Sequence, residues 1–219
     1  MSYKIPLFPL NTVLFPGMPL TLHIFEERYK QMINECREQR KPFGVVLIRQ
    51  GMEALGPMAQ PYPIGCTAEI VQVQEVGDGR LNILAIGQER FRILSLEQDQ
   101  PYLTGLVETF PLDESAPETH QAGWQLRPWV IEYLSLLSEV GEMEFDPGQL
   151  PEEPESLAFL AATLLQVPNR QKQSLLATAG AKALLTEMRG LYRRELPLLR
   201  HMLDEDEQPP LGPGSFSLS

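Results

Sequence analysis

The stretch IPLFPLNTVLFPGMPL, residues 5–20, sets the first elements of the fold. Four prolines, at positions 6, 9, 16 and 19, interrupt its large apolar side chains. A proline inside a helix removes a hydrogen-bond donor and clashes with the preceding turn, at a cost of about 3 kcal/mol, so the segment is not helical. In Phe15-Pro16-Gly17-Met18, Pro16 sets φ and Gly17 permits a positive φ, which is typical of a turn. We therefore expect an edge strand, a turn and a second strand whose aliphatic side chains enter a core.

The composition excludes several classes of protein. The 219 residues are 43% hydrophobic, enough for a substantial core, and the net charge of -11 argues against nucleic-acid binding, which needs clustered Lys and Arg. No stretch approaches the roughly 18 uncharged apolar residues of a membrane span. A signal peptide needs an uninterrupted apolar run near the N-terminus, and the four prolines interrupt every such run. Cys36 and Cys66 are far apart, without metal or redox spacing. We expect free thiols and a cytoplasmic protein that binds neither nucleic acid nor membranes.

The rest of the first half has the pattern of short strands around one helix. Apolar residues recur at helical spacing within FEERYKQMINECREQ, residues 25–39, and FGVVLI follows as a strand. Further strands are predicted in CTAEIVQVQEV, RLNILAIG, ERFRILSLEQ and PYLTGLVETF. The alternation changes phase between Ile70 and Val71, and again near Ile93 and Leu94, as a β-bulge would cause. Bulges bend strands toward closure, so we expect a small barrel-like antiparallel sheet.

The second half is predicted to be helical. One helix carries Trp124 and Trp129, with a kink at Pro128, and shorter helices precede a long final one. We expect both tryptophans to pack between the two halves. The tail DEDEQPPLGPGSFSLS is acidic and rich in Gly, Pro and Ser, which indicates disorder. The fold class is α+β: a β-rich subdomain over residues 1–112, a helical bundle over 113–203 and a disordered acidic tail over 204–219.

Several of these segments, taken together, resemble a known family. They include PLFPLNTVLFPGMPLTLHIFEERYKQMI, IGCTAEI, GDGRLNILAIGQERFRI and PESLAFLAATLLQVPNRQKQSLLATAG. From Tyr3 to Leu203 the chain resembles the substrate-binding N-terminal domain of the Lon family of ATP-dependent proteases. The resemblance implies a PUA-like β domain and a role in receiving polypeptides.

A Lon protease also has an ATPase module and a protease module with a Ser-Lys dyad. The ATPase needs a phosphate-binding loop, but the motif G-x-x-x-x-G-K-[ST] does not occur in this sequence. There is also no room for either module after Leu203. We therefore expect a stand-alone domain that is not an enzyme and has no catalytic residues, no cofactor and no metal.

The candidate binding residues lie in the Gly- and Pro-rich loop of residues 51–63. Met52, Leu55, Met58 and Tyr62 follow neither strand nor helix periodicity, so an exposed apolar surface is one interpretation. Methionine is unbranched and polarizable, which suits a surface that accepts varied partners. The alternative is that the loop folds down over the end of the barrel. We assign these four residues to polypeptide binding as a hypothesis.

Other polar residues are better explained structurally. Glu26, Glu27 and Arg28 begin a helix, where acidic side chains complement the helix dipole, and Arg28 is expected to make a structural hydrogen bond. The three histidines are scattered, and no spacing supports a triad or a metal site.

Two functional hypotheses remain open. The leading one is a non-enzymatic module that recognises unfolded or partner polypeptides through apolar surface, as an adaptor to a protease. The alternative is a small-ligand binder or an undetected enzyme that uses a cleft between the two subdomains.

Overall fold

Strand β1 (Ser2–Leu10) has two neighbours in the computed structural model, which describes residues 2–52, 59–113, 117–139 and 146–206. It pairs antiparallel with β7 (Leu103–Thr109) up to Leu7 and parallel with β3 (Phe43–Gln50) from Leu7 onward. The prediction of an edge strand is therefore wrong for β1 as a whole. The two pairings follow one another along the strand, so most of β1 has a partner strand on only one side. The two prolines of β1 are tolerated there, because proline has no N–H to donate to a second partner strand.

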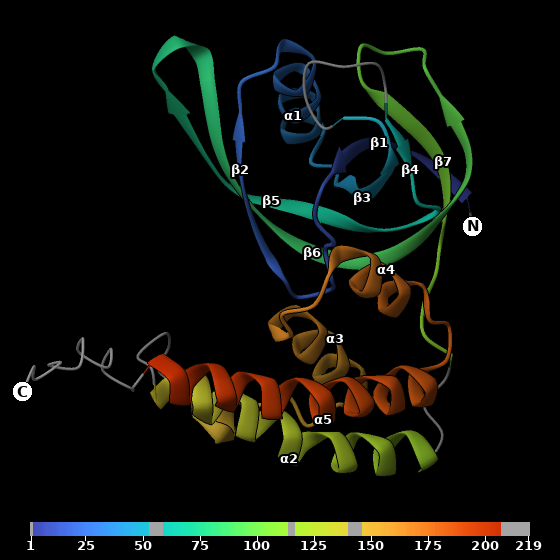
Figure 1. Ribbon diagram of the computed structural model, residues 1–219. Coiled ribbons are helices and arrows are strands. Elements are labelled where there is room, and N and C mark those ends of the chain that lie inside the picture. The colour runs from blue at the N-terminus through green and yellow to red at the C-terminus, as the bar shows by residue number, and fades with distance from the viewer. Residues whose placement is uncertain (1, 53–58, 114–116, 140–145, 207–219) are drawn as a thin grey trace, which may run out of the picture.

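The strand pairings form a closed circuit (Figure 1). β7 pairs with β6 (Arg80–Glu97), β6 with β5 (Ile64–Val76), and β5 with β3, which returns to β1. β2 (Pro19–Ile24) joins β6, and β4 (Gln60–Pro61) joins β3, both outside this circuit. The sheet is thus mostly antiparallel and barrel-like, as predicted, although the two additional strands prevent a clean barrel.

Both predicted bulges are confirmed. The register between β5 and β6 shifts between Ile70 and Gln72, and the register between β6 and β7 shifts between Ile93 and Ser95. The 3-10 turn η1 (Gly77–Gly79) joins β5 to β6. The shifts allow two long strands to bend and to take part in successive pairings around the sheet.

The predicted turn at Pro16 and Gly17 is also confirmed. The Met18 amide donates to the Phe15 carbonyl oxygen, 3.0 Å away, and Gly17 has a φ of +79°. The turn is docked on β6, because Gly17 and Met18 exchange hydrogen bonds with Gly87 at 2.8 and 2.9 Å. A Cβ atom on Gly87 would lie 2.2 Å from the Phe15 carbonyl oxygen, so this close approach requires glycine.

Helix α1 (Glu27–Gln39) covers one face of the sheet. It buries Tyr29, Met32, Ile33 and Cys36 in an apolar cluster with side chains of β1, β2, β3, β5 and β6. The Tyr29 ring stacks on Phe8 of β1, with 4.1 Å between ring centres. The predicted amphipathic helix therefore closes the core of the β half.

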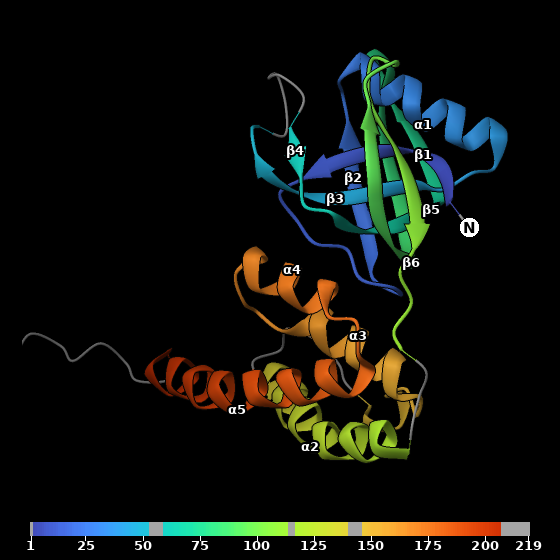
Figure 2. The same ribbon diagram turned by 90° about the vertical axis from the view of Figure 1, so that its right-hand side faces the viewer.

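The remaining helices form the second half. They are α2 (Pro117–Glu139), η2 (Pro147–Gln149), α3 (Pro154–Leu164), α4 (Asn169–Ala177) and α5 (Ala181–Asp206). The long helices α2 and α5 lie side by side, and α3 and α4 lie between them and the β half (Figures 1 and 2). None of the described helices combines the length and the apolar character needed to cross a membrane.

The largest apolar cluster contains residues from both halves. Phe15, Leu47 and Ile64 of the β half belong to the same cluster as Leu175 and Leu176 of α4. The chain passes from strand to helix between β7 and α2, around residue 112, and α5 continues to Asp206. The helical half is thus packed directly against one end of the barrel-like sheet.

Candidate functional site

The turn at Pro16 brings the first segment of the chain to the helical half. Residues Pro16 to Pro19 and η2 face one side of α3, including Phe159 and Leu160. Together they enclose a recess of about 350 Å³, which we call the first recess. Its lining is largely apolar and includes Pro16, Met18, Pro19, Pro151, Phe159 and Leu160.

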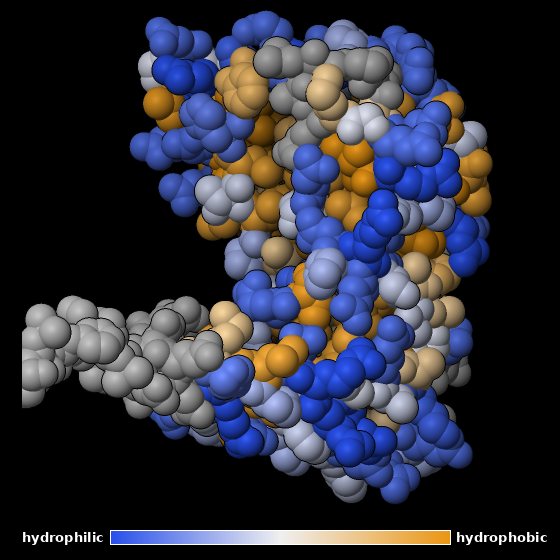
Figure 3. Space-filling model, viewed as in Figure 1, coloured by the Kyte–Doolittle hydropathy of each residue, from blue (hydrophilic) through white to orange (hydrophobic). Residues whose placement is uncertain are grey.

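A second recess adjoins the first, because Pro16 and Phe159 line both. It has a volume of about 330 Å³ and is bounded by β6, the segment after β7 and α3. Its apolar lining includes Phe110, Pro111 and Leu112, and its charged lining includes Glu89, Arg90 and Glu155. We call the two recesses together the groove. Figure 3 shows apolar surface among polar side chains in the region of α3 and α4, where the helices meet the β half.

Arg90 joins the two halves beneath the second recess. Its side chain projects from β6, is only 3% exposed, and donates from Nη1 to the carbonyl oxygens of Leu176 and Thr178, at 2.7 and 2.6 Å. The guanidinium lies 4.8 Å from the ring centre of Phe110 and 5.6 Å from that of Phe159. Burial lowers the pKa of Arg90 to about 10, so the group stays charged at neutral pH.

One hydrogen-bond donor of the Arg90 side chain is left unsatisfied. The Nη2 atom of Arg90 is buried and has no hydrogen-bond partner among the described residues. A buried donor without a partner costs free energy, and such groups are rare in folded proteins. This unpartnered donor belongs to a residue that lines the second recess, but it is itself buried.

Two of the four residues assigned from sequence, Met52 and Tyr62, lie in the described part of the chain. Met52 is 58% exposed, whereas Tyr62 is partly buried and packs against the largest apolar cluster. Leu55 and Met58 lie outside the described residues. The hypothesis that this loop binds polypeptide stays a prediction.

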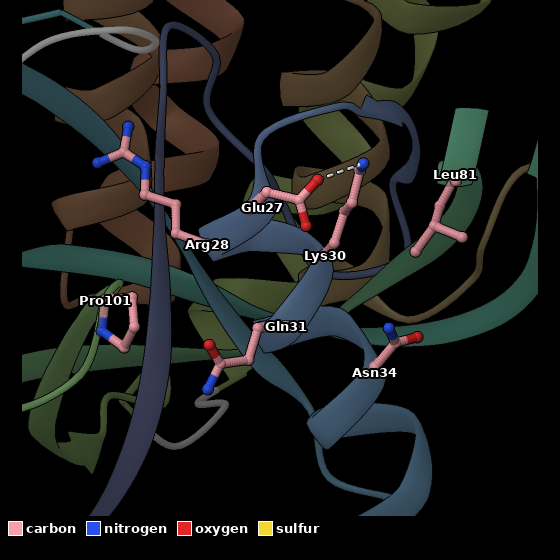
Figure 4. A pocket seen from close by; sticks show the side chains of 8 residues that line it. Glu27, Arg28, Lys30, Gln31, Asn34, Leu81 and Pro101 are labelled. Carbon is pink, nitrogen blue, oxygen red and sulfur yellow. Dashed lines mark hydrogen bonds and ion pairs between the residues drawn. The ribbon is translucent and has the colours of Figure 1, made fainter.

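A separate cavity of about 490 Å³ lies beside α1 (Figure 4). Its charged side chains are paired: Lys30 with Glu27 at 2.8 Å, and Arg28 with Glu26 at 2.9 Å. The Arg28 guanidinium also lies 4.6 Å from the centre of the Tyr29 ring. These contacts agree with the structural role expected for Arg28 and favour no ligand.

The residues with possible chemistry are dispersed or buried. His23 lies on β2, His120 on α2 and His201 on α5, and no group of three potential metal ligands occurs within the described ranges. Cys36 and Cys66 are free and buried, and burial raises the pKa of each thiol to about 12. Such thiols are poor nucleophiles at neutral pH.

The expectation for Trp124 is wrong. Its side chain is 73% exposed on α2, rather than packed between the halves, whereas Trp129 packs partly against the largest apolar cluster. Helical periodicity explains the difference, because Ala122, Leu126 and Val130 occupy the buried face and Trp124 lies outside it.

Sequence reasoning missed the residues that form the groove. An arginine within the apolar strand ERFRI is a signal that could have identified Arg90, because a buried guanidinium needs acceptors. Phe159 carries no such signal, since an apolar residue in α3 is equally compatible with the core. Pro16 was identified, but as a turn residue rather than as part of a surface.

Comparison with known proteins identifies the family. Residues 4–192 match the model of the ATP-dependent protease La (LON) substrate-binding domain. The chain is 28% identical over 199 residues to Lon protease 2 of Myxococcus xanthus and 28% identical over 200 residues to Lon protease of Anaeromyxobacter dehalogenans. In each case the match covers 90% of this chain and 24% of the relative, so the chain spans about a quarter of the length of these curated relatives.

Two solved structures have the same fold. The Lon N-terminal domain protein from Xanthomonas campestris matches with a TM-score of 0.61 and 26% identity, over 85% of this chain and 96% of that one. The N-terminal domain of Mycobacterium avium complex Lon protease matches with a TM-score of 0.68 and 18% identity, over 87% and 98% of the two chains. With the family match extending over most of its length, this chain belongs to the family of the Lon substrate-binding domain.

Proposed function

We propose that this chain binds unfolded or extended polypeptide segments through the groove, without nucleotide and without catalysing a reaction. The observation that carries the proposal is the pair of adjoining, largely apolar recesses that share Pro16 and Phe159. The family match supports it, because that family is named for substrate binding. A role as a cytoplasmic adaptor to a protease is part of the same proposal.

The size and lining of the recesses suit side chains of a bound segment. Each has a volume near the lower end of the range for ligand pockets, about 300 Å³. Proline side chains have almost no rotamer freedom and phenylalanine has only two side-chain torsions, so binding costs them little conformational entropy. Apolar contact has no directional requirement, which allows different sequences to occupy the same recess.

The direct test is fluorescence anisotropy with a short fluorescein-labelled peptide that carries one Phe and one Leu in a Gly/Ser background. We expect a Kd of roughly 1–100 µM without nucleotide, because a small apolar interface offsets only part of the entropy lost on association. Replacing Met18 and Leu160 together with Ser should weaken binding by about tenfold or more.

The matched control is Leu198→Ser, which removes an exposed apolar side chain from α5, outside the groove. It should leave the Kd unchanged, and the melting temperature of each variant verifies folding. Absence of binding to every apolar peptide would contradict the proposal, as would equal affinity of the groove variant and the control. A thermal-shift response to one small molecule, lost in the groove variant, would instead favour a small-ligand site in this cleft.

A further inference from the structure

The second recess carries charged groups that the apolar walls do not explain. Glu89 projects from β6 and is exposed, and Glu155 lies in the first turn of α3. Arg90 is the cation among the residues that line this recess. The recess therefore has two carboxylates and one guanidinium, and the environment of each decides which charge a ligand meets.

The Arg90 charge is already compensated within the protein. Two carbonyl oxygens accept from Nη1 near the C-terminal end of α4, where the helix dipole is negative, and two aromatic rings lie near the guanidinium. The side chain is almost completely buried. In contrast, Glu89 is exposed and forms no salt bridge within the described ranges. A ligand in the recess therefore meets a predominantly negative rim.

The carboxylates that line the recess indicate which charge on a bound segment is favoured. The Nη2 atom of Arg90 is buried, so an incoming ligand meets Glu89 and Glu155 rather than this donor. These carboxylates would repel an anionic side chain and attract a cationic one. The recess thus suits an apolar segment with cationic rather than anionic neighbours.

We infer that the groove discriminates among apolar polypeptide segments by charge, and that it prefers those with Lys or Arg beside the apolar anchor over those with Asp or Glu. The inference rests on the proposed function and adds a specificity to it. Glu89 and Glu155 are the specificity-determining residues.

The experiment uses three labelled peptides that share the Phe and Leu anchors and differ only at two flanking positions, which are Lys, Gln or Glu. The wild-type protein should bind the Lys peptide most tightly and the Glu peptide least tightly, with steps of roughly three- to fivefold, as expected for partly exposed charge pairs. The steps should shrink as salt is added, since salt screens exposed charges.

Two double variants distinguish an effect of the carboxylates in the recess from an effect of the overall net charge of -11. Glu89→Gln with Glu155→Gln should abolish most of the ranking among the three peptides. Glu75→Gln with Glu69→Gln removes the same charge from exposed positions of β5 outside the groove and should preserve the ranking.

The outcomes distinguish the two proposals. If the Gln peptide does not bind, the proposed function fails. If the Gln peptide binds but the Lys and Glu peptides bind equally well, or if both pairs of variants change the ranking equally, the charge preference at this recess is refuted while polypeptide binding stands.

Discussion

Arg90 on β6 donates a hydrogen bond from Nη1 to the carbonyl oxygen of Thr178, 2.6 Å away and just beyond the C-terminal end of α4. A second connection runs in the other direction, because Gln173 of α4 donates from Nε2 to the carbonyl oxygen of Ile64, 3.0 Å away. Arg90 and Gln173 are both buried, beside the apolar cluster that the two halves share. The geometry of the groove therefore depends on polar contacts between the halves as well as on apolar packing.

Replacing Arg90 with Met should destabilise the fold by about 2 kcal/mol. The substitution leaves the carbonyls of Leu176 and Thr178 without their guanidinium donor, and a buried unsatisfied polar group costs about 1–3 kcal/mol. Urea denaturation measures the change. Arg92→Met is the matched control: Arg92 is exposed and pairs with Glu108 at 3.4 Å, so its loss should cost under about 1 kcal/mol. Equal effects of the two substitutions would contradict the role of Arg90.

Gly87→Ala should destabilise the protein by about 2 kcal/mol or more, because its Cβ atom would lie 2.2 Å from the Phe15 carbonyl oxygen and would displace the turn at Pro16. Gly190→Ala is the opposite case. Gly190 lies within α5 and its added Cβ atom meets nothing within 4 Å, so the substitution should stabilise the helix by about 1 kcal/mol. In thermal unfolding, the melting temperature should fall for Gly87→Ala and rise for Gly190→Ala.

The buried thiols predict how stability changes at high pH. Burial raises the pKa of Cys36 and Cys66 from 9.0 to about 12. Between these pH values the unfolded chain binds fewer protons than the folded chain, so the free energy of unfolding falls as pH rises. Below pH 9 both states are protonated, and the thiols contribute no pH dependence.

Urea denaturation between pH 8 and pH 11 measures this slope, and it should be smaller in the double variant Cys36→Ala, Cys66→Ala. Ellman's reagent should react with the wild-type thiols in urea but only slowly in the folded protein at pH 8. Rapid reaction of the folded protein would show that the thiols are accessible.

The two tryptophans should differ in acrylamide quenching. Trp124 is 73% exposed, whereas Trp129 is partly buried with Arg193 5.8 Å from its ring centre. The variant Trp129→Phe, which retains only Trp124, should therefore be quenched more strongly than Trp124→Phe. Unfolding in urea should remove the difference, and equal quenching in the folded state would place Trp124 in a protected environment.

The loop hypothesis has a test that is independent of the groove. Changing Met52, Leu55 and Met58 together to Ser should weaken binding of the Phe/Leu peptide while leaving circular dichroism and melting nearly unchanged. Tyr62→Ser should instead lower stability by about 2 kcal/mol, because Tyr62 packs against the largest cluster. If the triple variant unfolds, the loop belongs to the core and the binding surface lies elsewhere.

Local patterns in the sequence were sufficient to predict most of the helices, strands and turns. The turn at Pro16 and Gly17 follows from backbone stereochemistry, which acts within a few residues. The bulges at Ile70 and Ile93 follow from the alternation of side chains along one strand. The helix that carries Trp124 was predicted, but Trp124 was assigned to the wrong face, although the spacing of Ala122, Leu126 and Val130 marks the buried face of this helix.

Long-range pairing was decided by the tertiary structure. The parallel alignment of β1 with β3, which closes the circuit of strands, depends on which segments meet after the chain has turned several times. The groove arises in the same way, because Pro16, Arg90 and Phe159 come from three distant segments that share no motif. Local periodicity specifies which side of an element is apolar. It does not specify which other element covers that side, because that depends on how all the elements pack together.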